Sequence, residues 1–291
     1  LSPELSLAFT ALLVIGLDLL VSRKIVLTLT AIIGLGISIG FTLLLWGSVV
    51  EDPSGSLSGV YNTLVVDRFS LFFKMLIISI TFLVVVISAD YVDWLKKLRG
   101  EYLGLIIISA TGMMVLLSTT EMISIYISLE LTTLPLIALV AFQMTSRSSE
   151  AGMKFLILSA TSSAFLLYGM VLIYGLSGST HLEVIGEVLS KGFSGTVPFG
   201  GYGVLLGVIL IIAGFGFKIS SAPFHMWVPD VYEGAPVQVL AFLSTASKAA
   251  TFAVLLRVFY IAFPSFDMDW AVLFAILAAV TMTLGNVMAM V

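Results

Sequence analysis

The chain has 291 residues, of which 59% are hydrophobic and only 10% are charged, and its formal net charge is −4. Because a soluble domain carries about 25% charged residues, this composition excludes a soluble enzyme and indicates a polytopic α-helical membrane protein. With no cysteine, two histidines and 13 basic residues, the sequence gives no support for an iron–sulfur cluster, a zinc–thiolate site, a haem pair or nucleic-acid binding.

Nine apolar segments follow one another along the chain, each about as long as a bilayer-crossing helix. They lie at about 4–22, 25–49, 63–89, 102–119, 121–143, 150–176, 201–228, 236–262 and 268–291. A further segment at about 180–192 places charged residues opposite apolar ones, which predicts an amphipathic surface helix instead of a span. Leu1 in place of Met, and an apolar run that continues to Val291, predict that the chain is part of a longer protein.

Basic residues are distributed unevenly among the predicted connections. The connections after the first, third and fifth spans contain Arg23, Lys24, Lys96, Lys97, Arg99 and Arg147. Those after the second and sixth spans contain only Arg68 and Lys191. Because cytoplasmic loops are enriched in Lys and Arg, this distribution predicts that the N-terminus lies outside.

Three charged residues lie deep inside predicted spans: Glu130 in the fifth, Lys218 in the seventh and Lys248 in the eighth. A charge at the bilayer centre costs roughly 2.5–3.5 kcal/mol on insertion scales, so such residues usually mark an ion pathway or pair with one another. One carboxylate neutralises one ammonium, and the remaining lysine favours a proton relay over a purely structural pair. Other charges are expected near span ends, where side chains reach the interface: Asp18, Lys74, Glu121 and Lys154.

The seventh span contains Pro223, five residues after Lys218, and Pro229 follows. A proline inside a helix removes a hydrogen bond and crowds the preceding turn, so we expect the helix to break between Lys218 and Pro229. Transporters place such breaks at ion sites. His225 lies beside the break and is a further candidate proton acceptor, with a structural role as the alternative.

Two stretches resemble the antiporter-like membrane subunits of respiratory complex I, the proton-pumping NADH:quinone oxidoreductase. One is KISSAPFHMWVPDVYEGAPVQVLAFLSTASKAATFAVLLRVF, from Lys218 to Phe259, and the other is SIYISLELTTLPLIAL around Glu130. Lys248 stands where the larger subunits of this family usually carry histidine, so the resemblance is to the N-type subunit. The similarity is strong over the fourth to eighth spans and rests on length and hydropathy over the first three.

This resemblance implies an antiporter-like fold with inverted five-helix repeats and a broken seventh helix. It implies three leading helices in residues 1–101, a first repeat in 102–262 and the start of a second repeat in 263–291. By position, Glu130 is similar to the family's modulating glutamate, Lys218 to its principal protonatable lysine and Lys248 to its bridging lysine. Lys154 matches a further basic position of the family and is a possible additional relay residue.

The function implied by the resemblance is proton translocation coupled to quinone reduction elsewhere in the complex. The chain itself is expected to hold no cofactor, with FMN, iron–sulfur clusters and quinone in partner subunits. Its expected partners are another antiporter-like subunit, small membrane subunits and the lipid bilayer of the bacterial inner membrane, with an organellar membrane as the alternative. Two other functions stay open, namely a subunit of a multi-subunit Na⁺/H⁺ antiporter or membrane-bound hydrogenase, and a structural membrane subunit.

Overall fold

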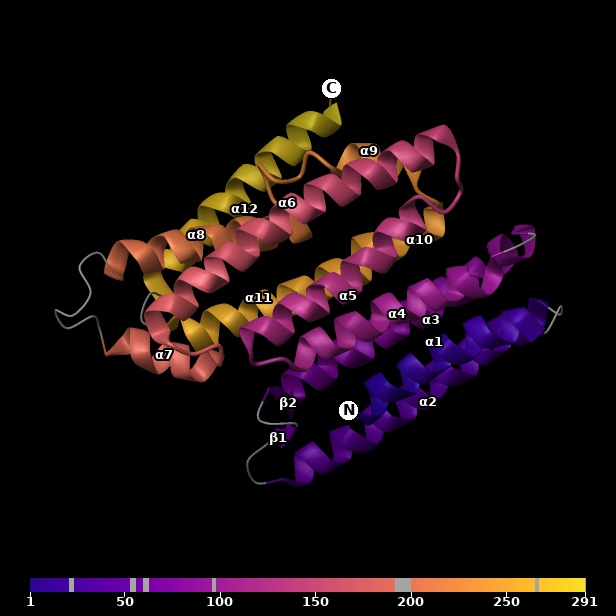
Figure 1. Cartoon of the computed structure of the whole chain (residues 1–291), viewed down its shortest axis with the longest axis horizontal. Coiled ribbons are helices and arrows are strands. Elements are labelled where there is room, and N and C mark those ends of the chain that lie inside the picture. The colour runs from indigo at the N-terminus through magenta and orange to yellow at the C-terminus, as the bar shows by residue number, and fades with distance from the viewer. Residues whose placement is uncertain are drawn as a thin grey trace.

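A computed structural model describes residues 1–20, 24–52, 56–59, 63–95, 98–191, 200–264 and 267–290. Arg23, Lys96 and Lys97, on which the predicted orientation partly depends, lie outside these ranges, as does Val291. The described chain is a bundle of long helices lying side by side (Figure 1). Nine of its helical segments are long and apolar enough to cross a membrane, which confirms the predicted number of spans.

The first half of the chain forms five of these spans. They are α1 (Ser2–Leu20), α2 (Lys24–Glu51), α3 (Arg68–Trp94), α4 (Arg99–Ser118) and α5 (Met122–Val140). A short antiparallel hairpin of β1 (Ser56–Gly59) and β2 (Leu64–Asp67) precedes α3, and β2 occupies the first residues of the predicted third span. The helix starts later because Asp67 caps it, with Ser70 completing a reciprocal capping box.

The second half begins with α6 (Ser146–Ser177), which ends at Gly178 in the left-handed conformation that glycine favours. The remaining elements are α7 (Leu182–Ser190), α8 (Gly200–Ile219), α9 (Val228–Gly234), α10 (Val237–Phe242), α11 (Lys248–Ala262) and α12 (Asp267–Met290). A π-helical turn at Leu243–Ser247 joins α10 to α11 inside the eighth span. The seventh span therefore ends at Ile219, so the predicted broken helix is confirmed.

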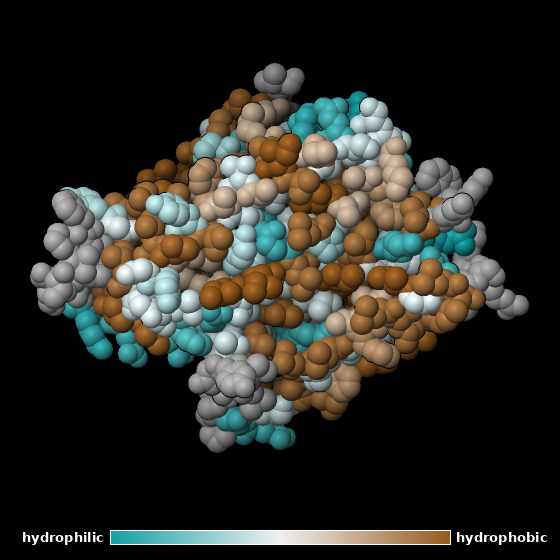
Figure 2. All heavy atoms as spheres, in the orientation of Figure 1, coloured by the Kyte–Doolittle hydropathy of each residue, from teal (hydrophilic) through white to brown (hydrophobic). Residues whose placement is uncertain are grey.

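The interior of the bundle is built around α4, which is buried along most of its length and packs against α1, α3 and α5. By contrast, many large apolar side chains of the outer helices are exposed, and apolar residues dominate the face shown in Figure 2. Exposed apolar surface on this scale does not occur on soluble monomers, and it is the surface that a membrane would cover. The amphipathic helix α7 has Leu182, Ile185 and Leu189 buried and Glu183 and Glu187 exposed.

Glycines bring α6 and α8 close together. A Cβ atom added to Gly169 of α6 would lie 2.7 Å from the carbonyl oxygen of Gly207, and one added to Gly214 of α8 would lie 2.5 Å from Leu166 Cβ. Small residues permit this close approach between membrane helices, where packing replaces the hydrophobic effect as the main attraction. The short distance between the two helices sets the position of Lys218, near the end of α8, against the side chains of α6.

A buried lysine at the break of the seventh span

The break after α8 leaves backbone carbonyl groups without helical partners, and nearby side chains and amides replace them. Ser221 donates its backbone N–H to Gly216 O at 2.8 Å, and the indole N–H of Trp227 donates to Phe217 O at 3.1 Å. Irregular backbone at membrane depth is stable only where protein or water satisfies such groups. Pro223 lies in the irregular segment, whereas Pro229 lies in the first turn of α9, where proline is tolerated.

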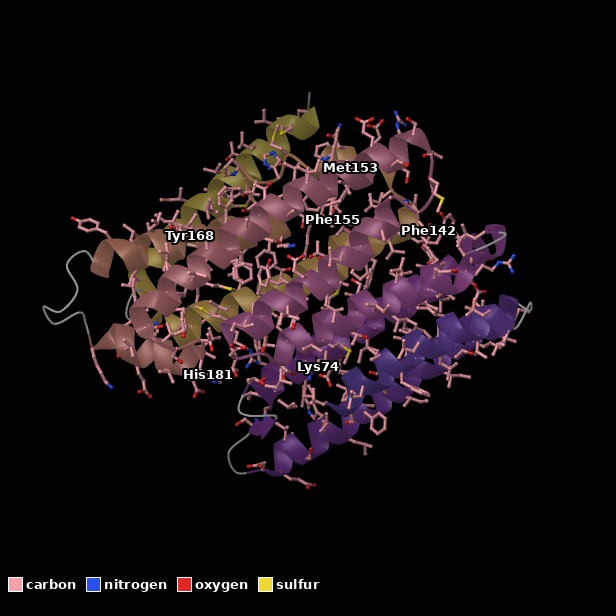
Figure 3. The ribbon with its side chains drawn as sticks, in the orientation of Figure 1. Lys74, Phe142, Met153, Phe155, Tyr168 and His181 are labelled. Atoms are coloured by element: carbon pink, nitrogen blue, oxygen red, sulfur yellow. The ribbon has the colours of Figure 1, made fainter. Side chains whose placement is uncertain are left out.

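Aromatic packing fixes the returning segment against α6. The ring of Trp227 stacks on Phe155 with centroids 4.7 Å apart and on Phe217 at 5.3 Å. Phe155 extends from α6 and is labelled in Figure 3. Stacking of this kind contributes about 0.5–1.5 kcal/mol per pair beyond the buried area. The segment is therefore held in place rather than free to swing away from Lys218.

Lys218 is the charged group at the centre of this region, and its side chain is only 9% exposed. Its Nζ donates hydrogen bonds to Thr133 Oγ1 of α5 at 2.8 Å and to Ser159 Oγ of α6 at 3.1 Å. Charge-assisted hydrogen bonds are about twice as strong as neutral ones, so two of them offset part of the cost of burying the ammonium.

Glu130 lies one turn before Thr133 on α5 and accepts a hydrogen bond from Ser163 Oγ at 2.5 Å. Because α5 and α6 run antiparallel, Glu130 faces Ser163 while Thr133 faces Ser159. Glu130 and Lys218 make no ion pair within 4.0 Å in the part of the chain that the structure describes. The carboxylate and the lysine instead contact different hydroxyl groups of α6, Ser163 and Ser159, which lie one helical turn apart.

The sequence did not identify the hydroxyl groups of Thr133, Ser159 and Ser163 as part of this site. Serine and threonine in membrane helices commonly bond to a carbonyl of their own helix, as Thr161 does to Ile157 O. Only the spacing of the two serines could have indicated this role, because Ser159 and Ser163 lie four residues apart and share a helix face.

Lys248 lies away from this hydroxyl cluster. Its ammonium is 5.9 Å from the centroid of the Tyr232 ring, and among the described residues it makes no hydrogen bond to Glu130 or Lys218. The structure thus brings two of the three deep charges together, and places the third beside an aromatic ring on α9. The π-helical turn ends directly before Lys248, and such turns are frequent at functional sites.

The two additional candidates have different surroundings. Lys154 is 42% exposed and forms ion pairs with Glu150 at 2.9 Å and Asp230 at 3.0 Å, so it connects α6 to α9 at the surface. His225 Nε2 lies 3.3 Å from Met288 Sδ of α12, while its Nδ1 is buried without a hydrogen-bond partner. Neither residue contacts the hydroxyl cluster around Lys218.

Two further charged residues, Lys74 and Glu121, were predicted from the sequence to lie near span ends. The expectation that Lys74 reaches the interface from a span end is wrong, because its side chain is fully buried and paired with Glu4. Glu121 lies at the start of α5 as expected, where it caps the helix by accepting from the backbone N–H and hydroxyl of Ser124. Within the described residues, no group of His, Asp or Glu side chains is arranged to hold a metal ion.

Residues 119–291 match the protein family described as NADH:quinone oxidoreductase/Mrp antiporter, transmembrane. NADH-quinone oxidoreductase subunit N of Dehalococcoides mccartyi is 41% identical over 291 residues, covering 99% of this chain and 59% of that protein. The subunit N of Moorella thermoacetica is 45% identical over 241 residues, covering 82% of this chain and 49% of its own.

A chain in the structure of respiratory complex I from Thermus thermophilus with bound aureothin superimposes with a TM-score of 0.71 and 31% identity. That match covers 88% of this chain and 53% of the solved one, and the chain spans about half the length of the curated relatives it matches. The resemblance to N-type subunits inferred from the sequence is confirmed. The chain belongs to the transmembrane family of the NADH:quinone oxidoreductases and Mrp antiporters.

Proposed function

We propose that the chain is part of a proton-translocating membrane subunit of a bacterial NADH:quinone oxidoreductase, with Glu130, Lys218 and Lys248 as its proton-carrying groups. One observation carries this proposal: the amine of Lys218 is buried at a helix break and bonds to two hydroxyl groups, next to a carboxylate that a third hydroxyl binds. An ionisable residue inside a membrane span usually marks a functional site, and the partners of Lys218 in this site are Thr133 and Ser159.

The chemistry of the cluster suits stepwise proton transfer. A hydroxyl group both donates and accepts, so Ser159 and Thr133 accept from the ammonium of Lys218 and can donate to the lone pair of its neutral amine after the proton has left. An ionised Glu130 stabilises the ammonium across the short polar path through Ser163 and Ser159. Movement of Glu130 away from this path would promote release of the proton toward Lys248.

The family resemblance supports a placement of this path in the assembled complex. Residues 102–262 would form the first antiporter-like repeat, 1–101 three leading helices and 263–291 the start of the second repeat. We propose a location in the bacterial inner membrane with the N-terminus outside, beside another antiporter-like subunit and small membrane subunits. Partner subunits would hold FMN, the iron–sulfur clusters and the quinone, and would couple electron transfer to the charge state of Lys218.

The full-length subunit in its assembled complex, reconstituted into proteoliposomes, tests the proposal. Glu130→Gln and Lys218→Met are combined and compared at equal complex content, with Lys191→Met as a control at the exposed end of α7. We expect the double variant to assemble and to reduce quinone while taking up fewer protons per quinone than the control. Full proton uptake in the double variant would leave a structural ion pair as the better explanation. Sodium-dependent proton exchange without quinone reduction would instead assign the chain to the antiporters of the family.

A further inference from the structure

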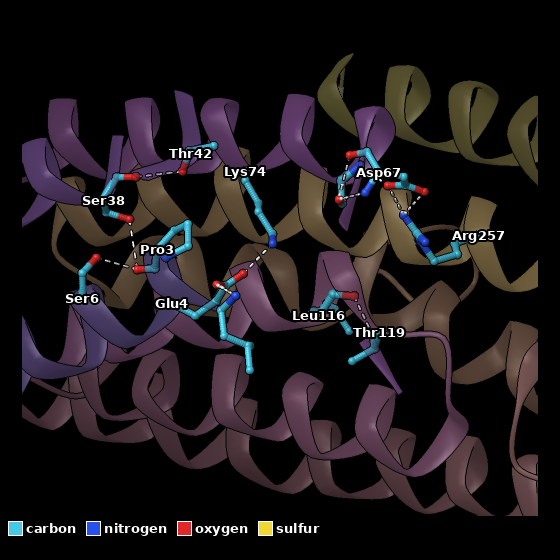
Figure 4. Close-up of polar contacts among 12 residues, drawn as sticks. Pro3, Glu4, Ser6, Ser38, Thr42, Asp67, Lys74, Leu116, Thr119 and Arg257 are labelled. Carbon is cyan, nitrogen blue, oxygen red and sulfur yellow. Dashed lines mark hydrogen bonds and ion pairs between the residues drawn. The ribbon is translucent and has the colours of Figure 1, made fainter. Parts of the chain in front are cut away.

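A buried pair of opposite charges in direct contact lies outside the site described above. Lys74 of α3 is 0% exposed and Glu4 of α1 is 3% exposed, and their Nζ and Oε1 atoms are 2.5 Å apart (Figure 4). The two residues are 70 positions apart in the chain, so the contact is a product of the fold. It joins two of the leading helices, to which the proposed relay assigns no role.

The surroundings of the pair supply no further hydrogen bond to it. On α2, the hydroxyl group of Ser38 donates to the backbone oxygen of Pro3, and that of Thr42 donates to the backbone oxygen of Ser38. Both carboxylate oxygens of Glu4 and the Nζ atom of Lys74 are buried without a hydrogen-bond partner of good geometry in the described chain. The backbone nitrogen of Leu1 lies 3.7 Å from the second carboxylate oxygen.

An ion pair without additional hydrogen bonds contributes little to holding two helices together. Attraction between two buried charges offsets their desolvation only when additional hydrogen bonds satisfy the remaining donors and acceptors. Apolar side chains of similar size would hold α1 against α3 at least as well. A direct lysine–carboxylate contact has another property, which is that transfer of a single proton across it converts the ion pair into a neutral amine and a carboxylic acid.

The helix that carries Lys74 is also tied to the helix that carries Lys248. Asp67, at the start of α3, accepts hydrogen bonds at 2.8 and 3.0 Å from the guanidinium of Arg257 on α11. In addition, α3 packs against α10 and the π-helical turn. Along α3, Lys74 thus has Glu4 beside it, and Arg68 and the Asp67–Arg257 pair lie about two helical turns away at the start of the helix.

We propose that Glu4 and Lys74 form a second protonatable site, in which a proton passes between Lys74 Nζ and Glu4 Oε1. The N–H bond breaks as the O–H bond forms, which leaves a neutral amine and a carboxylic acid, and the reverse step restores the ion pair. A proton that arrives from outside the pair finds the carboxylate as its acceptor. A role of this site as a store for translocated protons rests on the proposed function, whereas proton exchange within the pair does not depend on it.

Infrared difference spectroscopy of the assembled complex, recorded between the resting enzyme and steady turnover, tests the exchange directly. We expect a carbonyl band of a protonated carboxylic acid that disappears in Glu4→Gln and persists in Glu121→Gln, the capping carboxylate of α5. The absence of any such band from Glu4 overturns the proposal, whatever happens to pumping.

Pumping is compared in two double variants that avoid a lone buried charge. Glu4→Gln with Lys74→Met removes the site, and Glu4→Lys with Lys74→Glu exchanges the two charges. We expect the first to lose at least half of the protons pumped per quinone reduced, and the second to retain more than the first. If both pump at the ratio of the unsubstituted complex, the pair is a clamp. Lys218→Met is measured in parallel, because normal pumping in that variant refutes the proposed function and leaves the infrared result standing.

Discussion

The hydrogen bonds to Lys218 give a quantitative prediction for Ser159→Ala. This change removes one of the two hydrogen bonds that the ammonium donates. A hydrogen bond to a charged group contributes about 1.5–3 kcal/mol, which corresponds to roughly a 10- to 150-fold change in the ratio of ammonium to amine. We expect the number of protons pumped per quinone reduced to fall, and to fall further when Thr133→Val removes the second bond.

The neighbouring serine provides a matched control for this experiment. Ser162 is also buried on α6, but its hydroxyl donates to the backbone oxygen of Gly214 on α8 at 3.1 Å and does not contact Lys218. Ser162→Ala therefore removes a neutral helix–helix hydrogen bond on the same helix without touching the lysine. Proton uptake is measured in proteoliposomes that contain equal amounts of each complex. Equal losses in Ser159→Ala and Ser162→Ala would refute the reasoning, because both would then act only through packing.

Three further outcomes follow from the structure. Glu130→Asp, which keeps the charge on a shorter arm, should retain more proton uptake per quinone than Glu130→Gln. Burial alone would raise the pKa of the Asp67 carboxyl, but Arg257 and Ser70 together hold it below its usual value of 3.8. The stabilisation from this carboxylate is therefore present above that value and is lost as the pH falls below it. Asp67→Asn should flatten the pH dependence of thermal melting in that acidic range. Lys154→Met should lower the melting temperature slightly and leave pumping unchanged, which proton uptake in the same liposomes checks.

Hydropathy was sufficient to predict the nine spans, because a bilayer imposes a minimum length and an apolar composition on every crossing helix. The break of the seventh span was predictable for a related reason, since Pro223 cannot continue a helix. The hairpin before α3 was not, because its two strands are only four residues each, β1 in a Ser- and Gly-rich segment and β2 at the start of an apolar one.

Depth along a span identified Glu130 and Lys218, which the structure shows half-buried and buried respectively, but depth says nothing about which helix faces which. The pairing of Lys74 with Glu4 shows the limit of that criterion, because each residue lies near the beginning of its own helix and is nevertheless enclosed by neighbouring helices. Similarly, only the close packing of α8 on α6 turns Ser159 into a partner of Lys218. Which side chains contact each other across helices depends on how the helices pack, and the local sequence around each residue does not show it.

The π-helical turn at Leu243–Ser247 affects how this span tolerates changes in its length. A π-helical turn accommodates one more residue than an α-helical turn, and each residue of an α-helix advances the side chains by about 100°. Deletion of one residue within the turn would return it to α-helical geometry and keep the faces of α10 and α11 as they are. The same deletion within α11, between Lys248 and Arg257, would rotate one charge relative to the other and separate Arg257 from Asp67. The turn is thus the point in this helix where the chain can lose a residue and still direct Lys248 and Arg257 to their present partners.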